Sequence, residues 1–178
     1  MVIIVQSEDK VLRKISKEIP ISSIKKPKMQ KIIAEMNSAL DSQYDGVAIA
    51  APQIGVSLRL FIVSGRIFDE NFIRGEKPNK ETDQNKKREP NIVFINPIFK
   101  KISKDKKLMV EGCLSVRPLY GKVRRATRAI IEAYDEHGNK FTKDGSGLLA
   151  HIFQHEIDHL EGVLFIDKAK DLQEIFSE

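Results

Sequence analysis

The stretch "HIFQHEIDHLEG", residues 151–162, places three of the chain's four histidines within nine positions. Apolar side chains surround them on several faces of the segment 147–161, a pattern that predicts a buried helix. Ser146 is a suitable N-cap, and Gly162 suits the position just after the last turn. Because buried ionisable groups are costly unless they are paired or bound to metal, this helix needs a specific polar arrangement around it.

His155 and His159 are four residues apart and therefore share a helix face, with Cβ atoms about 5–6 Å apart. Glu156 is turned about 100° away, so it can face the open position of an ion without binding the ion. This His-Glu-x-x-His arrangement is typical of two metal ligands and one general base. A pair of hydrogen-bonded core histidines is the competing interpretation. Glu156 on so apolar a helix favours the metal.

His151 lies one turn earlier, but the drift of the helix places it about 80° around from His159. We therefore expect it on the helix surface or in a layer behind the ligands. The extended zinc-protease signature needs a third histidine where this chain has Phe165. The tail offers only Glu174 and Glu178.

Cys113 is the only cysteine and the best remaining soft ligand, within "EGCLS" (111–115). A lone cysteine is most often inert core, but the glycine beside it allows close approach of the backbone to an ion or substrate. A Cys-His-His set with an open fourth position is typical of a catalytic metal site.

The length of 178 residues suits one domain, and we expect residues 1–178 to form it. No stretch approaches the ~20 consecutive apolar residues of a membrane helix. A single cysteine excludes an internal disulfide and favours a reducing cytosol, so we expect a cytoplasmic protein. The net charge of +5 is spread among interleaved lysines and acids. Specific nucleic-acid binding is therefore not expected, whereas weak attraction to the ribosome is compatible with this charge.

The remaining pattern mixes strands with few helices and has no regular βαβ alternation, which predicts an α+β fold. The segment 65–90 turns strongly polar and is expected to be a surface insertion. The predicted elements are an amphipathic helix at 27–44, strands at 2–5, 58–63, 91–97 and 163–167, a hairpin that turns at 137–139, and a closing helix at 168–178.

Three segments together resemble the peptide deformylase family: "GVAIAAPQIG" (46–55), "EGCLS" (111–115) and "QHEIDHLEG" (154–162). Their order and spacing match, and the resemblance covers most of the chain except 65–90. It implies an α+β fold with antiparallel sheets packed around the helix that carries the motif. It also implies hydrolysis of the formyl group on the N-terminal formyl-methionine of newly made proteins, so the expected partners are N-formylmethionyl nascent peptides.

The resemblance further implies one divalent metal ion, Fe²⁺ in the cell, which Ni²⁺, Co²⁺ or Zn²⁺ can replace. The roles that it implies are metal ligation by Cys113, His155 and His159; general acid and base chemistry by Glu156; oxyanion stabilisation by Gln53 and the backbone N–H of Leu114; support of a ligand histidine by Glu111; and substrate binding by Gly46, Ala48 and Arg125.

Two positions depart from the family pattern. Ala48 stands where a second glycine is usual, so its Cβ would narrow the substrate channel, or strain the backbone if φ is positive. Arg117 stands where proline is common.

Two alternatives stay open at this point: another small metallohydrolase with the same helix motif, and a catalytically impaired relative that acts as a binding module on the ribosome.

Overall fold

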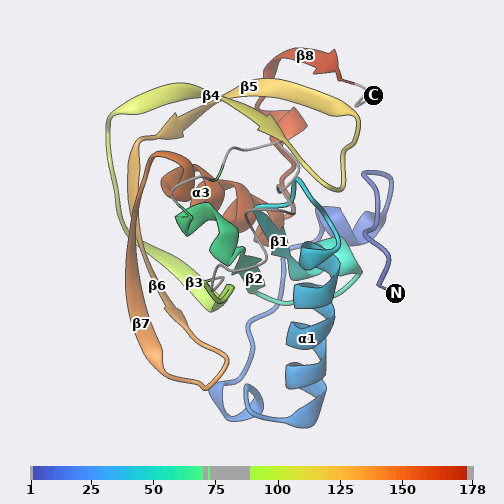
Figure 1. Cartoon of the computed structure of the whole chain (residues 1–178), viewed down its shortest axis with the longest axis vertical. Coiled ribbons are helices and arrows are strands. Elements are labelled where there is room, and N and C mark those ends of the chain that lie inside the picture. Colours follow the sequence, from blue (N-terminus) through green and yellow to red (C-terminus); the bar gives the residue numbers. More distant parts are fainter. Residues whose placement is uncertain (1, 70–71, 73–88, 176–178) are drawn as a thin grey trace.

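Two antiparallel sheets form the framework of the described residues, which are 2–69, 72 and 89–175 of this computed structural model (Figure 1). The five-stranded sheet has the order β1-β2-β3-β6-β7, and the three-stranded sheet has the order β4-β5-β8. The helices are α1 (Pro27–Asp41) and α3 (Gly147–Leu160). The strands are β1 (Ala48–Ala50), β2 (Leu60–Val63), β3 (Ile92–Ile102), β4 (Lys106–Gly112), β5 (Leu119–Ala126), β6 (Arg128–Tyr134), β7 (Lys140–Ser146) and β8 (Lys170–Glu174).

Strand β2 is buried on both faces because a helix packs on each side of it. Leu60 and Ile62 belong to the hydrophobic cluster that α1 completes. Phe61 and Val63, which alternate with them, belong to the cluster that α3 completes. Successive strand residues point to opposite faces, so the continuous apolar run of β2 separates two cores.

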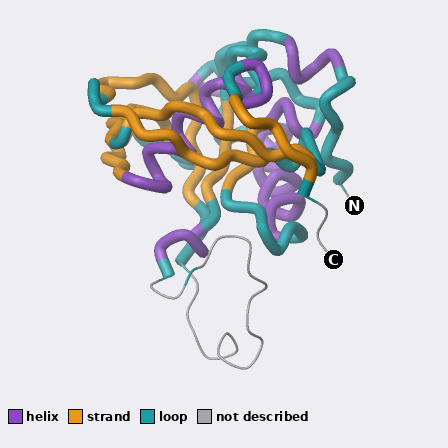
Figure 2. Tube along the Cα trace, turned by 90° about the horizontal axis from the view of Figure 1, so that it is seen from above, coloured by secondary structure: helices purple, strands orange, loops and turns teal. Residues whose placement is uncertain are grey.

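Helix α3 also contacts the second sheet, through β5. Gln154 makes this connection with its side-chain amide: Oε1 accepts from the N–H of Ala126 at 2.9 Å, and Nε2 donates to the Ala126 carbonyl at 3.0 Å. Strands of both sheets surround the helix in Figure 1, and long strands (orange) cross over helical segments (purple) in Figure 2. Because one helix serves both sheets, we propose that residues 1–178 form a single domain.

The predicted α+β fold with a central motif-bearing helix is confirmed. The amphipathic helix and the hairpin at 137–139 are present as α1 and as the β6–β7 turn, where Asp135 Oδ1 accepts from the N–H groups of His137 and Asn139. Gly162 follows α3 with φ of 73°, as expected for its position. Ser146 stands at the N-cap of α3, but its side chain makes no capping hydrogen bond. Most of the predicted insertion at 65–90 lies outside the described residues.

The predicted closing helix is wrong, because residues Lys170–Glu174 form strand β8 against β5. So short a segment has little helix stability of its own, whereas the edge of β5 offers unpaired backbone groups. The predicted strand at 163–167 is instead a 3₁₀ turn at Phe165–Asp167, where Asp167 Oδ2 accepts from the Leu164 N–H at 2.9 Å.

The predicted strand at 2–5 is also absent. Its Val5 N–H donates to the Gln53 carbonyl at 2.9 Å without forming a ladder. Of the helices in the described part of the chain, none combines the length and apolar character needed to cross a bilayer.

We predict that Phe153→Ala lowers the free energy of unfolding by about 3–5 kcal/mol, because it empties the aromatic centre between α3 and the five-stranded sheet. Phe153 is fully buried, and its ring centroid lies 5.4 Å from that of Phe94. Ile15→Ala is the control, since Ile15 is 71% exposed, and it should change stability by less than about 0.5 kcal/mol. Urea unfolding of both variants checks this, and equal losses would contradict it.

Candidate active site

A cavity of about 320 Å³ lies between the segment 45–48, the segment that follows β4 and the N-terminal half of α3. Seven of the ten residues that the sequence nominated for the site line it. They are Gly46, Ala48, Gln53, Cys113, Leu114, His155 and Glu156. The other three, His159, Glu111 and Arg125, do not line the cavity and are buried.

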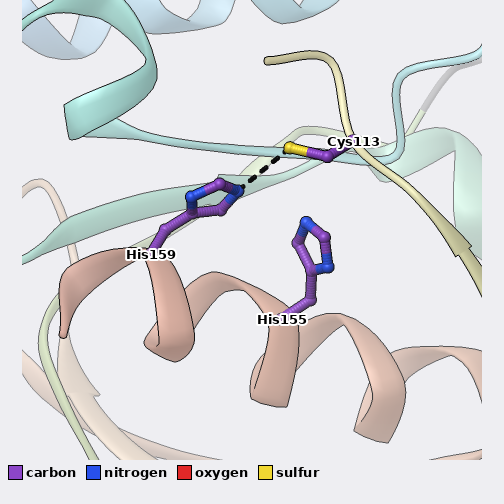
Figure 3. A group of neighbouring side chains, drawn as sticks. All are labelled: Cys113, His155 and His159. Carbon is purple, nitrogen blue, oxygen red and sulfur yellow. Dashed lines mark hydrogen bonds between the residues drawn. The ribbon is translucent and has the colours of Figure 1, made fainter. Parts of the chain in front are cut away.

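Cys113, His155 and His159 form a group whose ligand atoms all lie within 4.8 Å of one another. Figure 3 shows the two histidines on successive turns of α3, with Cys113 approaching from the chain above them. The Cys113 Sγ lies 3.2 Å from His159 Nε2. Metal–sulfur and metal–nitrogen bonds of about 2.3 and 2.0–2.1 Å at a tetrahedral angle place these atoms about 3.5 Å apart. The donor set therefore suits one borderline or soft divalent ion.

Glu111 contacts His155, the ligand histidine that the family resemblance led us to expect it to support. Its Oε2 lies 2.8 Å from His155 Nδ1. Because Glu111 also receives two hydrogen bonds from Arg125, it is an ionised acceptor, and His155 Nδ1 must carry the proton. In the neutral imidazole the Nε2 lone pair of His155 is then available to an ion, an arrangement typical of metal-binding histidines.

The structure corrects the expectation that Arg125 contacts the substrate. Arg125 is only 4% exposed, and it donates to Glu111 Oε1 at 2.6 Å and to Asp158 Oδ2 at 2.7 Å. Its guanidinium balances two carboxylates behind the cavity, so it supports the site from within the fold.

Gln53 is held with its amide N–H groups directed toward the cavity wall. The Ala50 N–H donates to Gln53 Oε1 at 2.8 Å, which leaves Nε2 to donate to Ser115 Oγ at 3.2 Å. Nε2 also lies 3.5 Å from Cys113 Sγ. The neighbouring Leu114 is tied through its carbonyl, which accepts from Gln6 Nε2 at 3.2 Å.

Glu156 is 3% exposed, and its Oε2 has no hydrogen-bond partner among the described residues. Burial raises the pKa of Glu156 to about 7, although the attraction of His155 opposes this shift. A carboxyl group with an uncommitted oxygen and a pKa near neutrality suits proton transfer at neutral pH. Burial also holds the pKa of His159 well below its usual range, so this imidazole is neutral, as a metal ligand must be.

Ala48 causes no backbone strain, because in the described chain only Asn96 and Asp171 have positive φ among non-glycine residues. It lies in strand β1, where its methyl group packs into the α3 core cluster. The sequence analysis did not assign a role to two other cavity residues. Arg117 pairs with Asp45 at 2.6 Å, and the buried His151 lies 2.8 Å from Glu111. The burial of His151 rules out the helix-surface position that the sequence analysis allowed for it and agrees with the other, a layer behind the ligands.

A profile of the polypeptide deformylase family matches residues 1–174. The chain is 39% identical to peptide deformylase 2 of Gloeobacter violaceus over 92% of this chain and 76% of that protein. It is 38% identical to the peptide deformylase of Desulfitobacterium hafniense over 94% of this chain and 93% of that protein. The chain belongs to the polypeptide deformylase family.

The fold agrees with this assignment. The crystal structure of a class I type b peptide deformylase from Acinetobacter baumannii with bound Met-Ala-Ser matches with a TM-score of 0.77 and 27% identity, over 94% of this chain and 98% of that chain. Polypeptide deformylases are metal-dependent hydrolases that remove N-formyl groups from nascent peptides, and this chain is a hydrolase of that kind.

We predict that His159→Ala weakens the binding of Co²⁺ by at least about a hundredfold. Loss of a residue that only hydrogen-bonds to a ligand costs ~10–100-fold, and loss of a ligand itself should cost more. The matched control is His137→Ala, which removes the one histidine outside α3, a residue whose side chain is 70% exposed. Competition with a chromophoric chelator measures both affinities. Equal Co²⁺ affinities for the two variants would rule out His159 as a ligand.

Proposed function

We propose that Cys113, His155 and His159 hold a single divalent ion in this deformylase, Fe²⁺ in the cell. The observation that carries the proposal is the convergence of these ligand atoms within 4.8 Å beside a cavity large enough for a methionyl group. One thiolate and two imidazoles suit iron, nickel, cobalt and zinc alike. Fe²⁺ is the proposal that follows from the family resemblance, and the other three ions are expected to replace it.

When bound, the ion would supply Lewis acidity that makes water a nucleophile near neutral pH and polarises the formyl group. The amide of Gln53 and the backbone N–H of Leu114 donate to the formyl oxygen as negative charge develops on it. Each such donor contributes about 3–4 kcal/mol to stabilisation of the transition state. Glu156 accepts the proton of the attacking water and returns it to the departing amine. The products are formate and a free N-terminus.

The surroundings of the cavity support an extended formyl-methionyl peptide as the substrate. Strands β1 and β4 lie at the edges of their sheets, and edge strands offer free backbone groups to a peptide. Gly46 and Ala48 lie on the first side of the cavity, and Leu148 and Ile152 add an apolar wall. Met-Ala-Ser, which the Acinetobacter baumannii relative binds, is therefore the model product for this chain.

The substrate is the N-terminus of a nascent chain, so we place the activity in the cytoplasm close to the ribosome. The net charge of +5 supports attraction to that polyanion.

We predict that Glu156→Gln lowers kcat/KM by about 10²–10⁴-fold while the fold and one bound metal ion are retained, because the amide cannot accept a proton. Glu161→Gln is the matched control one turn later, where Glu161 pairs with Arg59 at 2.6 Å outside the cavity. Formate release from formyl-Met-Ala-Ser by the metal-loaded enzyme measures both variants.

Near-normal activity of Glu156→Gln would refute the assigned base. Cleavage of internal peptide bonds by the wild type, without formate, would indicate a protease instead.

A further inference from the structure

Behind the proposed metal ligands, one carboxylate connects two turns of α3. Glu111 Oε2 lies 2.8 Å from His155 Nδ1, and Glu111 Oε1 lies 2.8 Å from His151 Nε2. His151 and His155 are four residues apart and share a face of the helix. His151 is 3% exposed and also lines the cavity. The proposed function assigns it no role.

The proton on His151 can be placed from its partners. Arg125 donates to Glu111 Oε1 at 2.6 Å and to Oε2 at 3.0 Å, so Glu111 is a carboxylate and only accepts. His151 therefore donates from Nε2, as His155 donates from Nδ1. Each oxygen of Glu111 then accepts two hydrogen bonds, one from β5 and one from α3.

The carboxylate of Glu111 is therefore held by two hydrogen bonds from β5 and two from α3. Arg125 fixes the plane of the carboxylate from β5 and also reaches α3 through Asp158, while Gln154 ties α3 to Ala126. These bonds hold the helix against β5, and the first contact that α3 makes with the carboxylate itself is His155. The second contact, from His151, fixes how α3 and with it the His155 ring lie against Glu111. Burial raises the pKa of Glu111, but the hydrogen bonds from His151, His155 and Arg125 hold it well below its usual range.

We propose that His151 is a positioning residue, which holds the Glu111 carboxylate from the preceding turn of α3 and thereby sets the orientation of His155 toward the metal. This inference rests on the proposed function, because it assumes that His155 is a ligand. It adds His151, four residues before the first histidine ligand, to the site as a residue that acts without touching the ion.

The test uses three variants of the full-length protein that differ in whether a donor can reach Glu111. His151→Gln places an amide N–H near the position of the imidazole Nε2. His151→Asn carries the same amide on a shorter side chain, and His151→Leu has no donor. Co²⁺ affinity is measured by competition with a chromophoric chelator, and the Co²⁺ absorption spectrum reports the ligand geometry.

We expect His151→Leu and His151→Asn to bind Co²⁺ about 10–100-fold more weakly than the wild type and to show an altered spectrum. His151→Gln should recover most of that loss. His151→Asn keeps the test decisive if the leucine variant does not fold. If His151→Leu and His151→Asn kept the Co²⁺ affinity and spectrum of the wild type, the proposal would be overturned. Equal losses of Co²⁺ affinity in all three variants would also overturn it.

Action through Glu111 is tested by the double variant His151→Leu/Glu111→Gln. It should bind Co²⁺ no more weakly than Glu111→Gln alone, because both changes break one connected unit. Fully additive losses would overturn the proposal. Leu148→Ala is the control for the cavity wall, since it should alter the KM for formyl-Met-Ala-Ser and leave Co²⁺ affinity unchanged.

Separate effects on kcat and KM distinguish a positioning role of His151 from a role in the cavity wall. With Co²⁺ at saturation, His151→Asn should lower kcat more than His151→Gln does, while the two amides give similar KM values. A change confined to KM would assign His151 to the cavity wall and overturn the positioning role. A wild type that binds no Co²⁺ or releases no formate would instead refute the proposed function, so the two failures are distinguishable.

Discussion

A negative charge buried where β4, β5 and α3 meet holds this site together. Glu111 is 1% exposed, and an unpaired carboxylate in such a place would be very costly. Its four hydrogen-bond donors come from Arg125 on β5 and from two histidines on α3. Removing any one partner leaves the charge less compensated, so the three elements are bound to a single relative position.

The position of the cysteine follows from this constraint. Cys113 is two residues after Glu111, immediately past the end of β4. Once the carboxylate is fixed against α3, the sulfur comes to lie 3.2 Å from His159 Nε2. Gln53 reaches the same place from the segment after β1, with its side-chain Oε1 held by the Ala50 N–H. Side chains from three distant parts of the chain, Gln53, Cys113 and His159, thus come together at one side of the cavity.

Much of this site was predictable, because helical spacing alone places His155, Glu156 and His159. The role of Cys113 followed from its being the only thiol in the chain and from a family resemblance. The position of Arg125 was not predictable, since nothing local in "KVRRATR" distinguishes a buried guanidinium from an exposed one. In the pairing of β4 with β5, Arg125 lies opposite Lys107, and only its long side chain, buried under α3, reaches Glu111.

The fold shows the same division between local and distant causes. The helical spacing of apolar residues in α1 and the apolar, β-branched and aromatic run of β2 are local features, and the sequence was sufficient to predict both elements. Strand β8 and the 3₁₀ turn at Phe165–Asp167 depend on partners far along the chain or on a single capping carboxylate, so local propensity misassigned them. The two faces of β2 became clear only when both helices were in place.

The most direct test of the account is X-ray absorption spectroscopy of the full-length protein loaded with one equivalent of Co²⁺. The account predicts a first coordination shell with one sulfur near 2.3 Å and two imidazole nitrogens near 2.0–2.1 Å, distances typical of such ligands. A shell without sulfur, or with a single imidazole, would contradict the proposal that Cys113, His155 and His159 share one ion.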